Sequence, residues 1–193
     1  MARADRRDQL LDTAQDVFTE RGYAATSMDD VAEAAGVTKP VLYDHFGSKE
    51  GLLGAVVDRS GQQMLDATTG AVTGLEPELA LRQGLTAFFQ YVDDHAGAWT
   101  LLLREVVPGT PAAEAVDRIR AVQVDVIAAL IGMHFKDADP DRATVYAHVV
   151  SGAAERLSTV RVTGLHVSPE QAAGLLMDAL WTGFAALVEK EHK

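Results

Sequence analysis

The sequence predicts an all-α fold of about nine helices. Apolar residues recur at intervals of three and four along most of the chain, as they do on one face of a helix. Glycine and proline divide this pattern into segments of helical length, and no stretch alternates apolar and polar residues as a strand would. With 193 residues, 48% of them hydrophobic, the chain is long enough to bury a substantial core.

The first predicted helix covers residues 3–21. Its apolar residues fall on one face, which should pack against the elements that follow, and Gly22 ends it. That face consists of Leu10, Leu11, Ala14, Val17 and Phe18.

Residues 27–46 predict two short helices separated by Gly36. Ser27 is a suitable N-cap for the first, Thr38 caps the second, and Pro40 lies in its first turn, where a missing N–H costs nothing. Two short helices joined by a glycine turn are a helix-turn-helix signature.

The second of these helices has an outward face rich in hydrogen-bond donors, which fits a DNA major groove. The donors are Thr38, Lys39, Tyr43 and His45. From this pattern alone, a helical hairpin with no DNA-binding role stays an open alternative.

A longer run of residues resembles the N-terminal DNA-binding domain of TetR-family transcriptional repressors. The resemblance covers about the first quarter of the chain and is carried by Gly22–Ser27, Val31–Ala32, Ala35–Phe46, Ser48–Glu50 and Leu52–Leu53. It implies a helix-turn-helix domain over residues 1–47 and a helical ligand-binding and dimerisation domain over residues 48–193.

The resemblance also implies specific DNA contacts. Residues of the second short helix should meet DNA, and residues at the starts of the neighbouring helices should hold phosphates. The predicted contacts are Thr26, Ser27, Thr38, Lys39, Pro40, Tyr43, His45 and Lys49. Asp29, Asp30 and Asp44 depart from the family pattern towards acidity.

The charge balance argues against a general nucleic-acid binder. The formal net charge is −11, and residues 1–60 hold 7 Lys and Arg against 11 Asp and Glu, a net charge of −4. Because non-specific affinity comes from neutralised phosphates, DNA binding must depend on the local placement of a few groups.

Six further helices are predicted after Gly47. Their ranges are 48–69, 77–95, 97–105, 111–135, 140–164 and 168 onwards, and the stretch from Thr69 to Pro77 is the clearest loop. In the helix from residue 140, the expected inward residues are Val145, Val149, Ala153, Leu157 and Val160.

The last two helices are rich in small and apolar residues, which allows close approach of two copies. A four-helix interface of a homodimer is the expectation, because the resembled family dimerises in this way and helix-turn-helix proteins commonly read two half-sites. Packing of both helices within one chain is the alternative. The interface candidates are Leu176, Leu180, Trp181, Phe184 and Leu187.

The resemblance further implies a pocket for a small hydrophobic or amphipathic ligand among the C-terminal helices. Aromatic, methionine and polar residues there are candidates, although residues of these types more often belong to the core or the surface than to a ligand site. The candidates are Met64, Phe88, Tyr91, Trp99, Arg104, Met133, His134 and Tyr146.

No pattern in the sequence predicts an enzyme, a cofactor site or a metal site. The chain has no cysteine, its histidines are scattered, and no nucleophile elbow, phosphate loop or dinucleotide fingerprint is present. No apolar run approaches a membrane span, so a cytoplasmic protein is expected.

The predicted function is therefore a repressor that binds a palindromic operator and is released by a small molecule. Two alternatives stay open. One is a regulator of the same fold that activates transcription or needs no ligand, and the other is a helical protein that no longer binds DNA.

Overall fold

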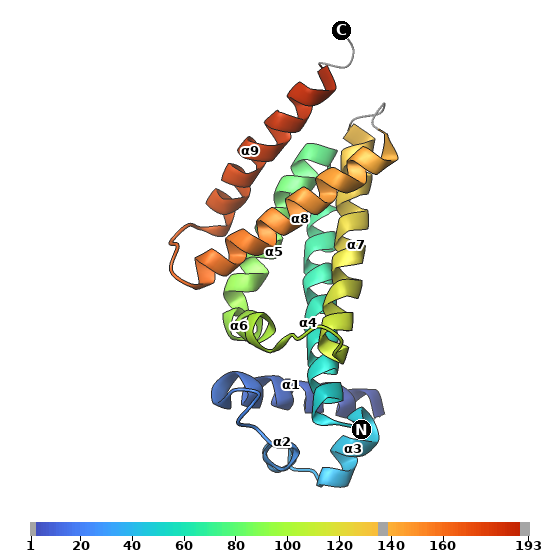
Figure 1. The fold of residues 1–193 in the computed structure, drawn as a ribbon, viewed down its shortest axis with the longest axis vertical. Helices are drawn as coiled ribbons and strands as arrows, with labels where there is room; N and C mark the ends of the chain where they lie inside the picture. The colour runs from blue at the N-terminus through green and yellow to red at the C-terminus, as the bar shows by residue number, and fades with distance from the viewer. Residues whose placement is uncertain (1–2, 135–138, 190–193) are drawn as a thin grey trace. The chain divides into compact units, whose positions relative to one another are not determined.

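The structure is a computed structural model that describes residues 3–134 and 139–189. The described part contains nine helices and no strand, as the sequence predicts. They are α1 (Arg3–Arg21), α2 (Met28–Ala34), α3 (Lys39–Phe46), α4 (Lys49–Val72), α5 (Pro77–Asp94), α6 (Ala96–Glu105), α7 (Pro111–His134), α8 (Pro140–Val162) and α9 (Pro169–Glu189), labelled in Figure 1. No helix among the described residues is long and apolar enough to cross a membrane.

The chain forms two compact units that share two helices. Unit 1 comprises Met1–Gln62 and Ala96–Ile119, and unit 2 comprises Gln63–His95 and Arg120–Lys193. Helices α4 and α7 are each divided between the two units, with one part of the helix in unit 1 and the other part in unit 2. This division differs from the predicted boundary at residues 47 and 48, because α6 and the first part of α7 pack with the N-terminal helices.

Unit 1 is built around the apolar face of α1. Leu10, Leu11 and Phe18 are buried there together with Leu42 of α3 and Leu52 of α4. Burial of each such side chain contributes on the order of 1.5–3 kcal/mol, so this shared core fixes the short helices α2 and α3, which have too few residues to be stable alone.

Helix α7 approaches α4 closely within unit 1 because α4 has glycine at the contact. A Cβ added at Gly54 would meet Pro111, and one added at Gly61 would overlap the side chain of Ile119. The glycines, seven residues apart, face the same neighbour on one side of α4.

Unit 2 packs α5 against both α8 and α9. The buried face of α5 contains Leu81, Leu85, Phe88, Phe89 and Val92. An ion pair ties α8 to α5, where the buried guanidinium of Arg161 donates to the exposed carboxylate of Asp93 at 2.6 Å and to the carbonyl of Val167 at 2.8 Å.

The predicted inward face of α8 is wrong. Val145, Val149 and Val160 are 58%, 44% and 37% exposed, whereas the residues buried by α8 are Ala143, Ala147, Val150, Ala154, Ser158 and Arg161. The inward face consists mainly of small alanines, which allow α8 to lie close to its neighbours, and three of the valines of α8 remain on the outer surface while Val150 is buried.

Helix α4 also extends further than predicted. It continues through Thr69 and Gly70 to Val72, in place of the first part of the expected loop, and the loop itself covers residues 73–76. The hydroxyls of Thr68 and Thr69 donate to carbonyls of the preceding turn, which lets these polar residues lie within a helix.

Candidate nucleic-acid interface and ligand cavity

The start of α2 is fixed by a reciprocal capping box. The Ser27 hydroxyl accepts from the backbone N–H of Asp30 at 3.2 Å, and the backbone N–H of Ser27 donates to the Asp30 carboxylate at 2.7 Å. Hydrogen bonds from the Ser27 side chain and backbone lower the pKa of Asp30. Asp30, which departs from the family pattern, therefore has a structural role here.

The turn between α2 and α3 requires a glycine. Gly36 has φ +64°, a left-handed conformation that side chains with a Cβ rarely adopt. The N–H of Val37 donates to the carbonyl of Ala32 at 3.0 Å, which closes the turn and directs the chain into α3.

Helix α3 has one buried anchor and an exposed polar face. Leu42 is fully buried, while Tyr43 is 44% exposed and Thr38 and Lys39 are exposed. His45 is half-buried, with its ring 5.8 Å from that of Phe46. Thr38 occupies the N-cap position, but its side chain makes no cap hydrogen bond, contrary to the expected capping role. Its hydroxyl is therefore not committed to the end of the helix.

Lys39 is held by an acidic residue of the preceding helix. Its Nζ lies 2.7 Å from the Asp29 carboxylate, and both side chains are largely exposed. This hydrogen bond, and the charge of Asp29, raise the pKa of Lys39. A phosphate that binds Lys39 must compete with Asp29 for the ammonium group.

Lys49, at the start of α4, lies over an aromatic ring. Its Nζ is 4.3 Å from the centre of the Tyr23 ring, and Tyr23 in turn packs edge-on against Phe18 at 5.2 Å. Burial, followed by the charges of Glu50 and Glu105, raises the pKa of Tyr23. The aromatic contact positions the ammonium group of Lys49 near the start of α2.

Thr26 is placed differently from the other predicted contacts. Its side chain is only 2% exposed, and its hydroxyl donates to the carbonyl of Gly22 at 2.8 Å. This placement favours a role in the turn before α2 and does not favour a phosphate contact by the side chain. Pro40 is exposed near the start of α3.

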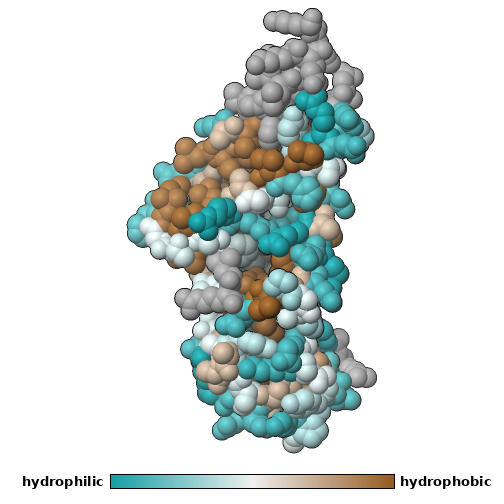
Figure 2. All heavy atoms as spheres, viewed as in Figure 1, coloured by the Kyte–Doolittle hydropathy of each residue, from teal (hydrophilic) through white to brown (hydrophobic). Residues whose placement is uncertain are grey.

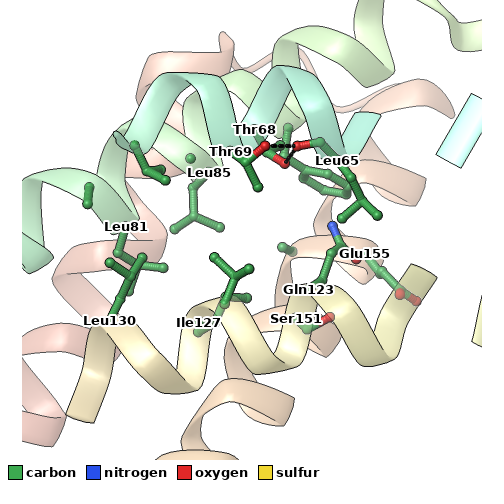
Figure 3. A pocket seen from close by; sticks show the side chains of 16 residues that line it. Leu65, Thr68, Thr69, Leu81, Leu85, Gln123, Ile127, Leu130, Ser151 and Glu155 are labelled. Carbon is green, nitrogen blue, oxygen red and sulfur yellow. Dashed lines mark hydrogen bonds between the residues drawn. The ribbon is translucent and has the colours of Figure 1, made fainter. Parts of the chain in front are cut away.

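A cavity opens within unit 2 between α4, α5, α7 and α8. Its volume is about 60 Å³, counted as the space open to the centres of water molecules. The walls are mainly apolar, and Figure 3 shows Leu81, Leu85, Ile127 and Leu130 pointing into the space. Gln123, Ser151 and Glu155 form a polar end. Such an arrangement suits a small molecule with an apolar body and one polar group.

Of the predicted ligand residues, Phe88 lines this cavity and the other described ones do not. Tyr91 stacks on His95 at 4.1 Å, and the ring of His134 lies 4.6 Å from that of Trp181. Among the remaining candidates, Met64 is buried, Met133 is 58% exposed and Trp99 belongs to unit 1. The hydroxyl of Tyr146 accepts a hydrogen bond from Arg142. The side chain of Arg104 lies outside the described part.

The sequence predicts a pocket among the C-terminal helices but not most of its lining, because the candidates were aromatic residues, methionines and charged or basic residues. The lining is mostly aliphatic, and its polar members are threonine, glutamine, serine and glutamate on otherwise apolar faces. Thr68 and Thr69 are adjacent within α4, although threonine has a low helix propensity. This pair was the feature of the sequence that could have indicated the cavity.

The outer surface of α8 and α9 carries an apolar face. Val145, Val149 and Leu175 are 58%, 44% and 63% exposed, and Figure 2 shows hydrophobic residues gathered in this region. Leu176 and Leu180 are half-buried, and Trp181 is only 7% exposed and covered within the chain. The side chains of Phe184 and Leu187 lie outside the described part.

The chain combines two features of DNA-binding regulators. One is a helix-turn-helix whose second helix, α3, has an exposed polar face, and the other is a helical unit that contains a cavity. Known proteins give the same assignment. The family model for bacterial regulatory proteins of the TetR family matches residues 10–56, and the tetracyclin repressor-like C-terminal domain matches residues 77–183. The chain belongs to the TetR family of transcriptional regulators.

Relatives within the family include both activators and repressors. The transcriptional activator FasR of Mycolicibacterium smegmatis is 39% identical over 103 residues, which cover 53% of this chain and 47% of FasR. The repressor KstR2 of Rhodococcus jostii is 34% identical over 109 residues, covering 54% and 52% respectively. The chain thus spans about half of the length of these two relatives. Both are named as transcriptional regulators and not as enzymes.

Solved structures match over nearly the whole chain. A TetR-like regulator from Rhodococcus sp. RHA1 has a TM-score of 0.74 at 33% identity and covers 96% of this chain and 98% of that one. A regulator from Pseudomonas aeruginosa PAO1 has a TM-score of 0.86 at 16% identity, covering 100% and 96%, which shows the shared fold.

Proposed function

We propose that this protein is a homodimeric repressor that binds a palindromic operator through α3 and leaves it when a small molecule occupies the cavity of unit 2. The observation that carries the DNA-binding part is α3 itself, with Leu42 buried and Thr38, Lys39 and Tyr43 on the outside. A short helix with donors on its exposed face suits the acceptors of base edges and phosphates.

The proposed DNA contacts are those on the exposed side of unit 1. Thr38, Lys39, Pro40, Tyr43 and His45 would meet the major groove, while Ser27 and Lys49 would hold phosphates. Operator binding would take place in the cytoplasm, where the chromosome of a bacterial cell lies.

The apolar face of α8 and α9 supports dimerisation. Apolar surface is exposed to water at Val145, Val149 and Leu175, which is energetically unfavourable. A second copy of the chain would bury this surface in a symmetric contact. The two helix-turn-helix units of one dimer would bind two half-sites about one turn of DNA apart.

The cavity supports regulation by a ligand. It lies in unit 2, whereas the helix-turn-helix lies in unit 1, and α4 runs from one unit into the other. In one conformation of the dimer, the spacing of the two helix-turn-helix units would not match the two half-sites. A ligand that binds this conformation more tightly would raise its population and so lower the affinity for DNA.

Activation of transcription is the second candidate function, favoured by the similarity to FasR. In vitro transcription from a promoter that contains the operator separates the two. A repressor lowers the yield of transcript as its concentration rises, and an activator increases it.

Replacement of Tyr43 by alanine tests the assignment of α3. We expect the affinity for a duplex selected from a random pool to fall at least tenfold, with an unchanged unfolding temperature, because Tyr43 is exposed and anchors no core contact. Fluorescence anisotropy measures the affinity. Leu79→Ala is the matched control, since Leu79 is also 44% exposed but belongs to α5. Equal affinities for wild type and Tyr43→Ala would contradict the assignment.

A further inference from the structure

The cavity of unit 2 also carries information about the charge of its ligand. We infer that it takes a short apolar molecule whose polar end donates hydrogen bonds and has no negative charge, and that Glu155 excludes carboxylates. This inference rests on the proposed ligand control and names the chemical class of the ligand.

The apolar part of the lining sets the body of the ligand. Aliphatic side chains from α4, α5, α7 and α8, together with Phe88, surround the space. Since one water needs about 10–15 Å³ counted in this way, the cavity holds roughly four to six waters. A chain of about six carbons or a single ring is of that size.

The threonines of α4 present acceptors to this space. The Thr68 hydroxyl donates to the carbonyl of Met64 at 2.9 Å. The Thr69 hydroxyl donates to the carbonyl of Leu65 at 2.7 Å (Figure 3). Because each hydroxyl hydrogen is used within the helix, only oxygen lone pairs remain for a ligand.

The single formal charge among the lining residues is negative. Glu155 lines the polar end beside Gln123 and Ser151, and no Lys, Arg or His belongs to the lining. The Glu155 carboxylate accepts two hydrogen bonds from Arg120, from Nε at 2.7 Å and from Nη2 at 2.8 Å. A carboxylate oxygen can accept further hydrogen bonds, so Glu155 remains able to receive a donor from the cavity.

An anionic head would meet unfavourable surroundings there. It would lie next to the carboxylate of Glu155 with only the neutral donors of Gln123 and Ser151 to compensate, because the guanidinium of Arg120 is already bound to Glu155. An alcohol or an ammonium group instead donates to Glu155 and to the side-chain oxygens of Gln123 and Ser151.

A series of hexyl compounds tests this inference on the full-length protein. The probes are n-hexanol, n-hexylammonium and hexanoate, which share one apolar chain and differ in the head. Titration followed by heteronuclear NMR gives their dissociation constants. We expect hexanol and hexylammonium to bind at least tenfold more tightly than hexanoate, with shifts at Ser151 and Ala154.

Glu155→Gln supplies the second arm, because it removes the negative charge and keeps the shape. We expect the difference between hexanol and hexanoate to fall below threefold in this variant. Glu114→Gln, which loses an exposed carboxylate of α7 that does not line the cavity, is the matched control and should retain the full difference.

Each other outcome overturns the inference. Equal or tighter binding of hexanoate by the wild-type protein means that the cavity accepts anions. A preference that persists in Glu155→Gln means that another group sets it, and failure of all three probes to bind means that the cavity is not a site for such molecules. Operator affinity, measured without any probe, shows separately whether the DNA-binding function holds.

Discussion

At the scale of single residues, acidic side chains of the DNA-binding unit have structural partners. Asp30 closes the capping box of α2, and Asp29 pairs with Lys39. These contacts explain two of the three departures from the family pattern that the sequence shows. They also indicate that the helix-turn-helix has a reduced affinity for DNA, because the ammonium group of Lys39, which is paired with Asp29, is less available to phosphates.

Replacement of Asp29 by asparagine tests this restraint. We expect tighter binding to arbitrary duplex DNA, and a slope of log K against log salt that is more negative by about 1, because Lys39 becomes free to neutralise a phosphate. Anisotropy titrations at several salt concentrations give the slope.

The control must remove the same charge without releasing Lys39. Glu33→Gln does so, because Glu33 is an exposed acidic residue of the same helix α2. If both variants change the salt slope equally, the effect comes from net charge and the ion pair has no specific role.

At the scale of elements, the α4–α7 contact depends on the absence of a side chain. Gly61 is buried against Ile119, whereas Gly70, in the same helix, has open space around its Cβ position. The two glycines have the same intrinsic cost within a helix but opposite surroundings, which makes them a matched pair.

Alanine at these positions should act in opposite directions. We expect Gly70→Ala to stabilise the protein by about 0.5–1 kcal/mol through helix propensity. Gly61→Ala should destabilise it by about 1–3 kcal/mol, because the added methyl forces Ile119 and α7 to move. Urea unfolding measures both, and stabilisation by Gly61→Ala would contradict the described contact.

The elements themselves were largely predictable from the sequence, because local signals define them. Gly22, Gly36 and Gly47 have positive φ where helices end, and proline stands at the starts of α5, α7, α8 and α9. The inward face of α8 was not predictable, because its buried residues are mainly alanines with Val150, Ser158 and Arg161, while Val145, Val149 and Val160 face outward.

The candidate site divides in the same way. The exposed face of α3 followed from the local pattern around Leu42, since one buried residue fixes the orientation of so short a helix. The cavity did not, because its lining comes from four helices that are distant in sequence, and such a set depends on how the helices of unit 2 pack. Only Phe88 was common to prediction and structure.

At the scale of the whole molecule, the proposed recognition of a palindromic operator requires two copies of the chain. Val149→Glu tests the dimer, because a charge on the exposed apolar face of α8 would be buried without a partner at a symmetric interface. We expect a monomer by light scattering, with the helical content retained. Val122→Glu, on α7 at 46% exposure, is the control and should remain dimeric. A dimeric Val149→Glu protein would place the interface elsewhere.

Selection of duplexes from a random pool by the purified protein tests the central claim most directly. A sequence-specific homodimer that reads DNA through α3 predicts an enriched palindrome, with two half-sites about one helical turn apart. Occupancy of both half-sites by a dimer would follow from the stoichiometry of the complex. Recovery of unrelated sequences, or of none above background, would contradict the account of this protein as an operator-binding regulator.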